Sequence, residues 1–361
     1  MIKLSEPPIG EEEIAAVAEV VRSGHLAMGA NVRAFEKEFA AYLGCKHAIA
    51  LNSGTAALQL GIQALEIPEH SEVITTPFTF IASSNALLYN KLTPVFADIG
   101  DDFTIDPSAI EACITEKTKA VLVVHLFGNP CNMSAIEKLC KEHGLLLIED
   151  CAQAPGAVHA GKRVGNFGDI ACFSFYATKN ITTGEGGMVT GRDSAAADII
   201  KVVRNQGQKG MYEHVAMGYN FRMAELQAAL GRVQLKKLDA LNGQRRENAQ
   251  YLRETLRDVK GLALPAEARD SRHVFHQFTI RVLNSKRDAL MKQLADTGIE
   301  AKIFYPKPVY LQPVYRGMGY RTGLCPRAEE FSEQVLSIPV HPHLTQEELE
   351  QVGAQVKEFF Q

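Results

Sequence analysis

From about residue 46 the sequence alternates between short apolar runs and longer segments with helical spacing, and this alternation most constrains the fold. The helical segments include TAALQLGIQAL and SAIEKLCKEHG, and the apolar runs are HAIALN, EVITTP, TPVFADI, AVLVVHLF, LLLIED and DIACFSF. Runs with little polar alternation, each followed by a helix, are typical of parallel strands that are buried on both faces. We therefore expect an α/β fold whose main sheet is doubly wound and mostly parallel.

The segments that flank this region predict a helix at the start and a second unit at the end. Residues 11–22 have an acidic first turn, an apolar face of Ile14, Val17 and Val21, and Gly24 just past the end, which predicts a helix. After residue 241 the pattern changes: VFHQFTIRV alternates like a half-exposed strand, and RDALMKQLADTG is an amphipathic helix that Gly298 would end. We expect a large domain at 1–242, which includes the N-terminal helix, and a smaller α+β domain at 243–361.

Composition excludes several classes of protein. The 361 residues carry a net charge of -4 without a long run of one sign, so a nucleic-acid partner is not expected. The N-terminal residues are polar and acidic, and the apolar run AVLVVHLFG is too short for a membrane span, so we expect a cytoplasmic protein. The seven cysteines form no C-x-x-C pair and His341–His343 has no nearby acidic or cysteine partner, so neither disulfides nor a metal site are expected.

In a doubly wound sheet, ligands bind at the carboxyl ends of the strands, where this sequence places four motifs. They are NSGTAAL, FTFIAS, EDCAQA and FYATKNITTGEGG. NSGTAAL passes from a strand through Gly54 into a helix that starts near Thr55, so free backbone N–H groups would face an anion such as phosphate. An ordinary strand-to-helix turn capped by Ser53 or Thr55 explains the same residues.

A carboxylate and a lysine complete the set of candidate site residues. Asp150 ends the most apolar strand, where an unpaired carboxylate costs several kcal/mol, so it needs either a cation or a capping role at the next helix. Lys179 lies between a strand and a glycine-rich loop, although most lysines are simply solvated. Phe80 adds an aromatic ring, unless it is an ordinary core residue. Pyridoxal phosphate needs these features: a phosphate cradle, a stacking ring, a carboxylate and a lysine for a Schiff base.

Two other nucleotide signals fail. GAVHAGKR, from Gly156, matches the spacing of a P-loop, but Arg163 stands where Ser or Thr would hold magnesium, and no clear helix follows. The sequence also contains no G-x-G-x-x-G dinucleotide fingerprint, which argues against a nicotinamide enzyme.

The chain also resembles a known family along nearly its whole length. The motifs NSGTAAL, EDCAQA, FSFYATKNITTGEGGM, GYNFRMAELQAALG, YPKPVY and LSIPVHP are similar, and in the same order, to those of the DegT/DnrJ/EryC1/StrS nucleotide-sugar aminotransferases. These are fold type I pyridoxal phosphate enzymes. The resemblance implies that Lys179 forms the Schiff base and shuttles the proton between the cofactor's C4' carbon and the substrate carbon, and that Asp150 keeps the ring nitrogen protonated. It also implies that Gln153 binds the 3-hydroxyl and that Phe80 stacks on the ring.

The resemblance further implies how the phosphate is held. Thr55, the backbone N–H of Ala56, and Ser174 would bind it, together with Asn220 of the partner subunit, because this family builds its sites across a homodimer interface. Taken alone, Asn220 could equally be an amide that stabilises its own loop.

For the reaction, the resemblance implies transfer of an amino group from L-glutamate to a keto group of a nucleotide-linked sugar in amino-sugar biosynthesis. The loop KNITTGEGG favours C4 as the acceptor carbon, and Lys179 stands where related dehydratases carry histidine. Tyr176 and Tyr310 would lie near the substrate, and Tyr310 departs from the histidine expected at its position. The alternatives are a C3-keto sugar, a keto-cyclitol, and a non-catalytic sugar-binding regulator with the same fold.

Overall fold

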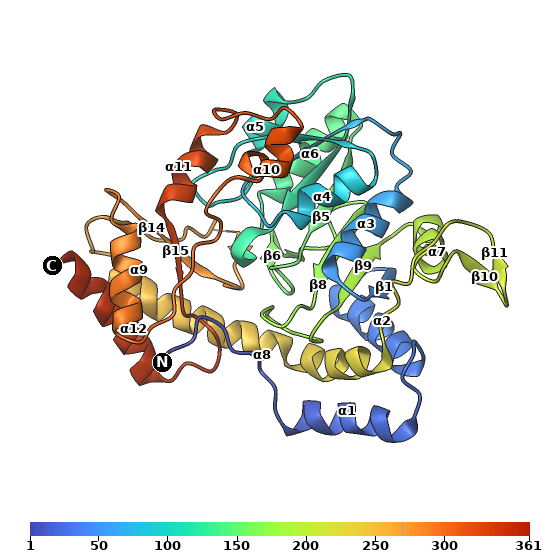
Figure 1. Cartoon of the computed structure of the whole chain (residues 1–361), viewed down its shortest axis with the longest axis horizontal. Helices are drawn as coiled ribbons and strands as arrows, with labels where there is room; N and C mark the ends of the chain where they lie inside the picture. Colours follow the sequence, from blue (N-terminus) through green and yellow to red (C-terminus); the bar gives the residue numbers. More distant parts are fainter. Residues whose placement is uncertain (269) are drawn as a thin grey trace.

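A seven-stranded sheet forms the centre of the molecule (Figure 1). The computed structural model describes residues 1–268 and 270–361. The strand order is β1-β9-β8-β5-β4-β2-β3, and every neighbouring pair that excludes β9 is parallel, which confirms the expected α/β fold with a mostly parallel sheet. The strands are β1 (His47–Leu51), β2 (Glu72–Thr75), β3 (Thr93–Phe96), β4 (Thr118–Val124), β5 (Leu146–Asp150), β8 (Ile170–Ser174) and β9 (Gly187–Gly191).

Strand β9 was not among the predicted runs, and it is antiparallel to both of its neighbours. Its sequence, GMVTG, is short and begins and ends with glycine, so it lacks the long apolar run that marks the other strands. Glycine is needed at its start, because a Cβ at Gly187 would lie 2.2 Å from the backbone oxygen of Ser53. This close approach holds the end of β1 beside the glycine loop that follows Lys179.

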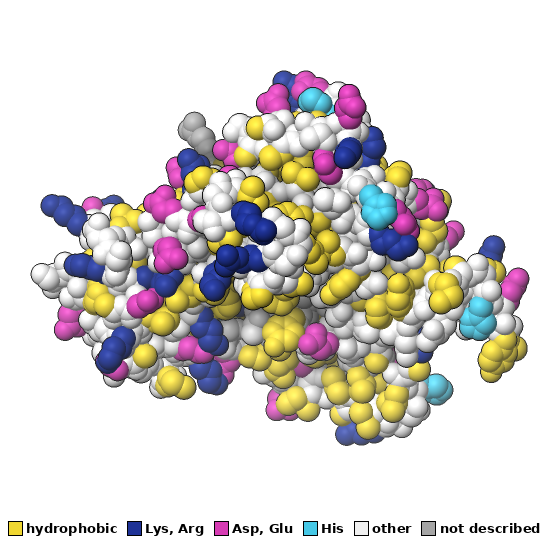
Figure 2. All heavy atoms as spheres, turned by 45° about the horizontal axis from the view of Figure 1, so that its top comes forward, with side chains coloured by type: hydrophobic (Ala, Val, Ile, Leu, Met, Phe, Trp, Pro, Cys, Tyr) yellow, Lys and Arg dark blue, Asp and Glu magenta, His cyan; other side chains and the backbone are white. Residues whose placement is uncertain are grey.

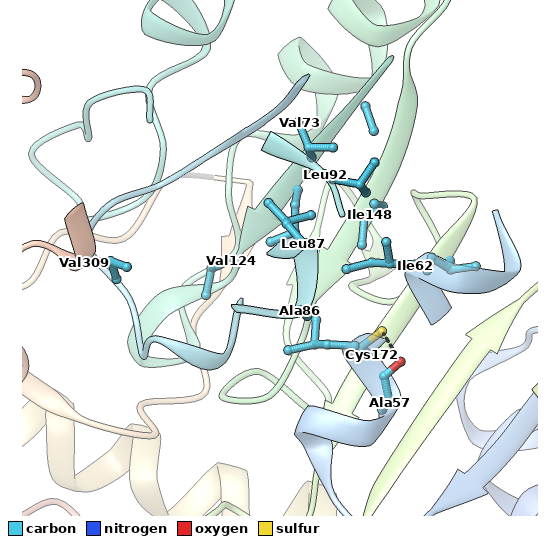
Figure 3. Packing of buried hydrophobic residues seen from close by; sticks show 14 of the residues in the cluster. Ala57, Ile62, Val73, Ala86, Leu87, Leu92, Val124, Ile148, Cys172 and Val309 are labelled. Atoms are coloured by element: carbon cyan, nitrogen blue, oxygen red, sulfur yellow. Dashed lines mark hydrogen bonds between the residues drawn. The ribbon is translucent and has the colours of Figure 1, made fainter. Parts of the chain in front are cut away.

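Helices cover both faces of the sheet. One face packs against α3 (Gly54–Ala64), α4 (Ala82–Tyr89) and α7 (Ser194–Val203), and the other against α2 (Ala30–Leu43), α5 (Pro107–Ala112) and α6 (Met133–His143). In β4, Leu122 and Val124 pack in the first core cluster, on the face covered by α3, α4 and α7, whereas Val121 and Val123 pack on the opposite face, against α5 and α6. Figure 3 shows the first cluster, where residues of α3 and α4 pack against Ile148 and Val124 of the sheet. Burial on both faces explains why the strands show no polar alternation.

The predicted N-terminal helix is α1 (Glu11–Ser23), and it ends at Gly24, which has a φ of 71°. Its expected apolar face does not pack into the core, however. Ile14 is 54% exposed and Val21 is 57% exposed, whereas Glu13 and Val20 are buried. The helix lies beneath the long helix α8 (Glu225–Leu256) in Figure 1, with Glu13 facing α8, so its apolar stripe is left open.

The C-terminal residues build a second sheet, in the order β12-β14-β15. Its hydrophobic cluster includes residues of α8 and also Ile2, which forms a bridge with Ile299. The expected boundary after residue 242 falls inside α8, a helix of 32 residues that continues past the boundary to Leu256. Of the run VFHQFTIRV only FTIRV forms the expected strand, β14, and it is almost wholly buried rather than half exposed, since helices cover it as well. The elements are β12 (Leu262–Ala263), β14 (Phe278–Val282), β15 (Val335–Ile338), α9 (Arg287–Asp296), α10 (Pro313–Gly317), α11 (Pro326–Gln334) and α12 (Gln346–Phe360).

Short strands complete the fold. GAVHAGKR forms the antiparallel pair β6 (Val158–His159) and β7 (Lys162–Arg163), flanked by β13 (Ser271–Arg272), so it is not a P-loop. The hairpin of β10 (Gln208–Gly210) and β11 (Glu213–His214) projects from the body at the right of Figure 1, and Figure 2 shows hydrophobic side chains on this projection. No helix within the described residues is long and apolar enough to cross a membrane.

Candidate active site

Lys179 lies in a tight turn just beyond the end of β8. The turn is closed by a hydrogen bond from the backbone N–H of Lys179 to the carbonyl oxygen of Tyr176, at 3.0 Å. Gly184, with a φ of 78°, lets the chain reverse toward β9. Burial lowers the pKa of the Lys179 ammonium from 10.5 to about 8, and the negative charge of Asp150 partly opposes this shift. The lysine is therefore not an ordinary solvated charge, because its side chain is partly buried and the charge of a buried carboxylate acts on its amine.

Asp150 is that carboxylate, and it lies at the end of β5 with 4% of its surface exposed. Ser83 Oγ donates a hydrogen bond to its Oδ2 at 2.7 Å, and the N–H of Ala152 donates to its Oδ1 at 3.0 Å. Burial raises its pKa, while these hydrogen bonds and the charge of Lys179 lower it. The chain turns after Asp150 without starting a helix, so its alternative role as a helix cap is not found. What remains is a buried acid that needs a cation.

Gln153 follows on the same loop and has both ends of its amide engaged. Its Oε1 accepts from the N–H of Phe127 at 2.6 Å, and its Nε2 donates to the hydroxyl of Tyr305 at 3.2 Å. The ring of Phe80 lies 6.4 Å from that of Tyr305, and 57% of Phe80 is exposed. An aromatic ring this open is not an ordinary core residue, so one of its faces is free for a flat ligand.

The predicted phosphate cradle forms where β1 meets α3. Ser53 caps the helix, since its Oγ accepts from the N–H of Ala56 at 3.1 Å, so this N–H is already paired. A Cβ at Gly54 would lie 2.7 Å from the Cβ of Ser174, so only glycine lets these two segments meet. The N–H groups of Gly54 and Thr55 lie at the positive end of α3, where a helix has no internal acceptors for them. The arrangement suits an anion held by Thr55 and Ser174.

Asn220 lies close to this cradle within its own chain. Its carbonyl oxygen accepts from Asn52 Nδ2 at 3.4 Å, and the N–H of Asn52 donates to the carbonyl oxygen of Phe221 at 2.9 Å. Asn220 is exposed and lies at the base of the projecting β10–β11 hairpin. Its expected contribution to the partner's site stays a prediction.

The two tyrosines expected near the substrate have different surroundings. Tyr176 is 47% exposed on the lysine turn, as a substrate contact requires. Tyr310 has no exposed surface: its ring packs against Phe96 and its hydroxyl hydrogen-bonds to Glu329 and to the N–H of Cys325. The structure therefore places Tyr310 in the core, and no geometry supports a substrate contact from it.

Glu149, next to Asp150, points to the opposite face of the sheet and has no exposed surface. The Oε2 atom of Glu149 lies 3.0 Å from Nε2 of His125. The Glu149 carboxylate also accepts hydrogen bonds from the backbone N–H groups of Gly165, Phe167 and Gly168, each at 2.8 Å. Burial alone would raise the pKa of Glu149, but the hydrogen bonds of His125 and of these backbone groups hold it below 4.5. With Cys151 these groups resemble a metal-binding cluster, yet their carboxylate and imidazole atoms are already paired.

Sequence reasoning missed three members of this assembly. Ser83 fixes the Asp150 carboxylate and occurs in FTFIASS, a motif valued only for Phe80. Tyr305 lies in YPKPVY, where attention fell on Tyr310. His125 interrupts the apolar run AVLVVHLF, and this interruption was the only signal that the sequence offered for it.

The residues present fit pyridoxal phosphate. A partly buried lysine lies within the electrostatic reach of a buried carboxylate, and a glycine contact and a helix start form an anion cradle. An exposed aromatic ring lies beside Tyr305, whose hydroxyl accepts from the Gln153 amide. Each of these features suits a different part of the cofactor: the lysine its aldehyde, the carboxylate its ring nitrogen, the cradle its phosphate and the aromatic ring its flat face.

Comparisons with known proteins agree with this geometry. The model of the DegT/DnrJ/EryC1/StrS aminotransferase family matches residues 7–357. The "Pleiotropic regulatory protein" of Geobacillus stearothermophilus is 40% identical over 100% of this chain and 98% of its own length. The "dTDP-3-amino-3,4,6-trideoxy-alpha-D-glucose transaminase" of Streptomyces venezuelae is 40% identical over 99% of this chain and 94% of its own. The crystal structure of S. venezuelae DesV in complex with a ketimine intermediate is 41% identical, with a TM-score of 0.94, and covers 97% of this chain and 94% of that one.

Proposed function

The chain belongs to the DegT/DnrJ/EryC1/StrS aminotransferase family, and on that premise we propose that it moves an amino group from L-glutamate to the keto carbon of a nucleotide-linked sugar. The observation that carries the proposal is the nearness of Lys179, on the turn after β8, to the buried carboxylate of Asp150, whose negative charge acts on the lysine amine. The printed name of the S. venezuelae relative, a dTDP-sugar transaminase, supports the class of substrate.

Lys179 has two tasks in this reaction. Pyridoxal phosphate, when bound, supplies an electron sink for the negative charge that develops at the substrate carbon. The amine of Lys179 would hold the cofactor through its aldehyde, and when free it would carry a proton at its Nζ to and from the substrate carbon. A pKa of about 8 suits this second task, because a base acts best when its pKa lies near the working pH.

Asp150 and its neighbours orient the ring. Burial raises the pKa of Asp150, so the carboxylate gains most from a cationic partner such as a protonated ring nitrogen. Ser83 fixes the direction in which the carboxylate points, at 2.7 Å. Gln153, held by Phe127 and Tyr305, would present its amide to the ring hydroxyl, and Phe80 would cover one face.

Thr55 and Ser174 would bind the phosphate, together with Asn220 of the partner subunit in a shared homodimeric site. Exposed apolar side chains support the dimer, since Ile14 and Val21 of α1 and Met211 and Met217 of the hairpin are all more than half exposed. On α1, Ile14 lines an apolar groove, and apolar surface of this kind marks protein interfaces. Asn220 lies at the base of the same hairpin.

The acceptor carbon separates two candidate functions. The loop KNITTGEGG next to Lys179 favours a 4-keto sugar. The S. venezuelae relative, by its printed name, makes a 3-amino sugar, which favours a 3-keto sugar instead. A keto-cyclitol and a non-catalytic regulator remain as alternatives, and a regulator would have no need for both Lys179 and Asp150.

The test is to incubate the cofactor-loaded protein and L-glutamate with matched 3-keto and 4-keto nucleotide sugars, and with the same sugars lacking the nucleotide. We expect 2-oxoglutarate and an aminated nucleotide sugar, with the 4-keto compound preferred. Activity confined to the 3-keto series would overturn the position. Activity only without the nucleotide would overturn the class of substrate, and no amination at all would favour a regulator.

A further inference from the structure

Asn180, the residue after Lys179, is completely buried and hydrogen-bonded on every side. Its Nδ2 donates to Asn242 Oδ1 of α8 at 2.7 Å and to the carbonyl oxygen of Val274 at 3.1 Å. Its Oδ1 lies 3.1 Å from Nδ1 of His276. The lysine turn is therefore tied both to the long helix and to residues 274–277.

The hydrogen bonds of Asn180 fix the protonation of His276. Because both hydrogens of the Asn180 amide are directed at oxygen atoms, its Oδ1 must accept, so Nδ1 of His276 carries a proton. Burial lowers the pKa of His276 well below 6.5, and the positive charges of Lys179, Arg245 and His273 lower it further. His276 is thus a neutral donor to Asn180.

Residues 274–277 also hold the opposite side of the site. The N–H of Val274 donates to the carbonyl oxygen of Gly128 at 3.0 Å, and the N–H of Gln277 donates to that of Phe127 at 3.2 Å. The N–H of Phe127 in turn donates to Gln153 Oε1. A Cβ at Gly128 would lie 2.9 Å from the side chain of Val274, so the two segments are in close contact. One short segment is therefore bonded both to Asn180 and to the loop that holds Gln153.

We propose that Asn180 and His276 are positioning residues that form a latch, which holds the lysine turn against residues 274–277 so that the amine of Lys179 faces Asp150. The latch sets Lys179 and Gln153 in one frame, because both are anchored to the same segment. Asn242 extends this frame, since its Nδ2 donates to the carbonyl oxygen of Pro155 on the loop after Asp150, at 2.9 Å. Neither latch residue needs to touch the substrate. The importance of the latch for catalysis rests on the proposed function, whereas its effect on Lys179 does not.

The test measures Lys179 itself in the cofactor-free protein. A small acylating reagent modifies only the neutral amine, so the rate of Lys179 modification against pH, followed by mass spectrometry of peptides, reports its pKa. We compare the wild-type protein with His276→Leu, Asn180→Ala and His276→Asn. The asparagine can place an amide N–H near the position of the lost Nδ1–H. His159→Leu is the matched control, because His159 is equally buried and hydrogen-bonds to Ser134 and Ser271 far along the chain.

We expect a wild-type midpoint of about 8 and an upward movement by about one unit or more in His276→Leu and Asn180→Ala, because a released turn gives the ammonium back to water. His276→Asn should stay close to the wild type. With cofactor and substrate, kcat should fall by about 10- to 100-fold in the two latch variants, with a much smaller change in KM.

Two results would overturn the latch: unchanged midpoints in both latch variants, or an equal movement in His159→Leu, which would indicate a general effect of losing a buried histidine. A wild-type protein with the expected midpoint that nonetheless binds no cofactor would contradict the proposed function while supporting the latch.

Discussion

The interior around Lys179 and the segment that carries Asn220 are opposite in character. In the interior, Asp150, Gln153 and Asn180 each have hydrogen-bond partners on surrounding elements. In the projecting hairpin, Met211 is 89% exposed and Met217 is 90% exposed. A protein gains nothing by holding such side chains in water. A single chain therefore completes the lysine and carboxylate half of the site, whereas the segment around Asn220 lies open to solvent, where the partner subunit that we propose could cover it.

Helix α1 repeats the pattern of the hairpin. One of its two buried side chains is a glutamate, Glu13, which pairs with Lys237 at 2.9 Å, whereas Ile14 and Val21 are more than half exposed. The stripe predicted from the sequence lies at the surface, where Ile14 and Val17 line a groove together with Leu230 of α8. A hydrophobic pattern indicates that a face will be buried and does not say by which molecule.

Mixing two inactive variants should give the largest effect, because it tests directly whether the segment around Asn220 completes the site of a partner subunit. We expect Lys179→Ala and Asn220→Ala chains each to be inactive, and equilibrated mixtures to recover about a quarter of wild-type activity, because half of the dimers are mixed and each has one intact site. The measurement is the amination rate against the ratio of the two chains. If mixtures recover nothing while mixed dimers form, Asn220 acts within its own chain or has no role.

Asp150→Asn is the next largest change, and it tests the interior alone. The variant should bind the cofactor, but its turnover should fall by about 10²- to 10³-fold, because a neutral amide no longer stabilises the positive ring nitrogen. Since burial raises the pKa of Asp150, its charge does not stabilise the folded state, and unfolding by urea should show no loss of stability. Turnover at the wild-type rate would refute its role.

Glu149→Gln is the matched change at the neighbouring position, and it should act on stability instead. The variant removes a fully hydrogen-bonded buried charge and should lower the free energy of unfolding by about 3 kcal/mol at pH 7. The pKa of Glu149 is held below 4.5, so the stability it contributes is present above pH 4.5 and is lost as the pH falls through the lower folded value. Urea unfolding of the variant and the wild type at pH 7 and at a pH below 4.5 measures this difference in the free energy of unfolding. Equal stability of the two proteins at pH 7 would contradict the prediction.

The sequence predicted six of the seven strands of the main sheet, because apolar runs are local signals, although β1 pairs only with the antiparallel β9. The roles of the strand-end residues stay predictions. Strand β9 was not predicted because its sequence, GMVTG, begins and ends with glycine and contains no run of apolar residues as long as those of the other strands. Tyr305, Ser83 and His276 escaped for another reason: their roles depend on contacts with residues far away in the chain, such as Gln153, Asp150 and Asn180. Tyr310 shows the converse error, since a site motif also contains residues whose task is packing.

The most direct test of the central claim is to load the protein with pyridoxal phosphate, reduce it with borohydride, and map the labelled peptide by mass spectrometry. The account predicts a yellow protein whose visible absorption disappears on reduction, with the cofactor fixed to Lys179 and to no other lysine. The matched variant Lys179→Ala should remain unlabelled, and Lys201→Ala, which changes an exposed surface lysine, should label like the wild type. A label on a different lysine, or a protein that binds no cofactor, would contradict the assignment of this site.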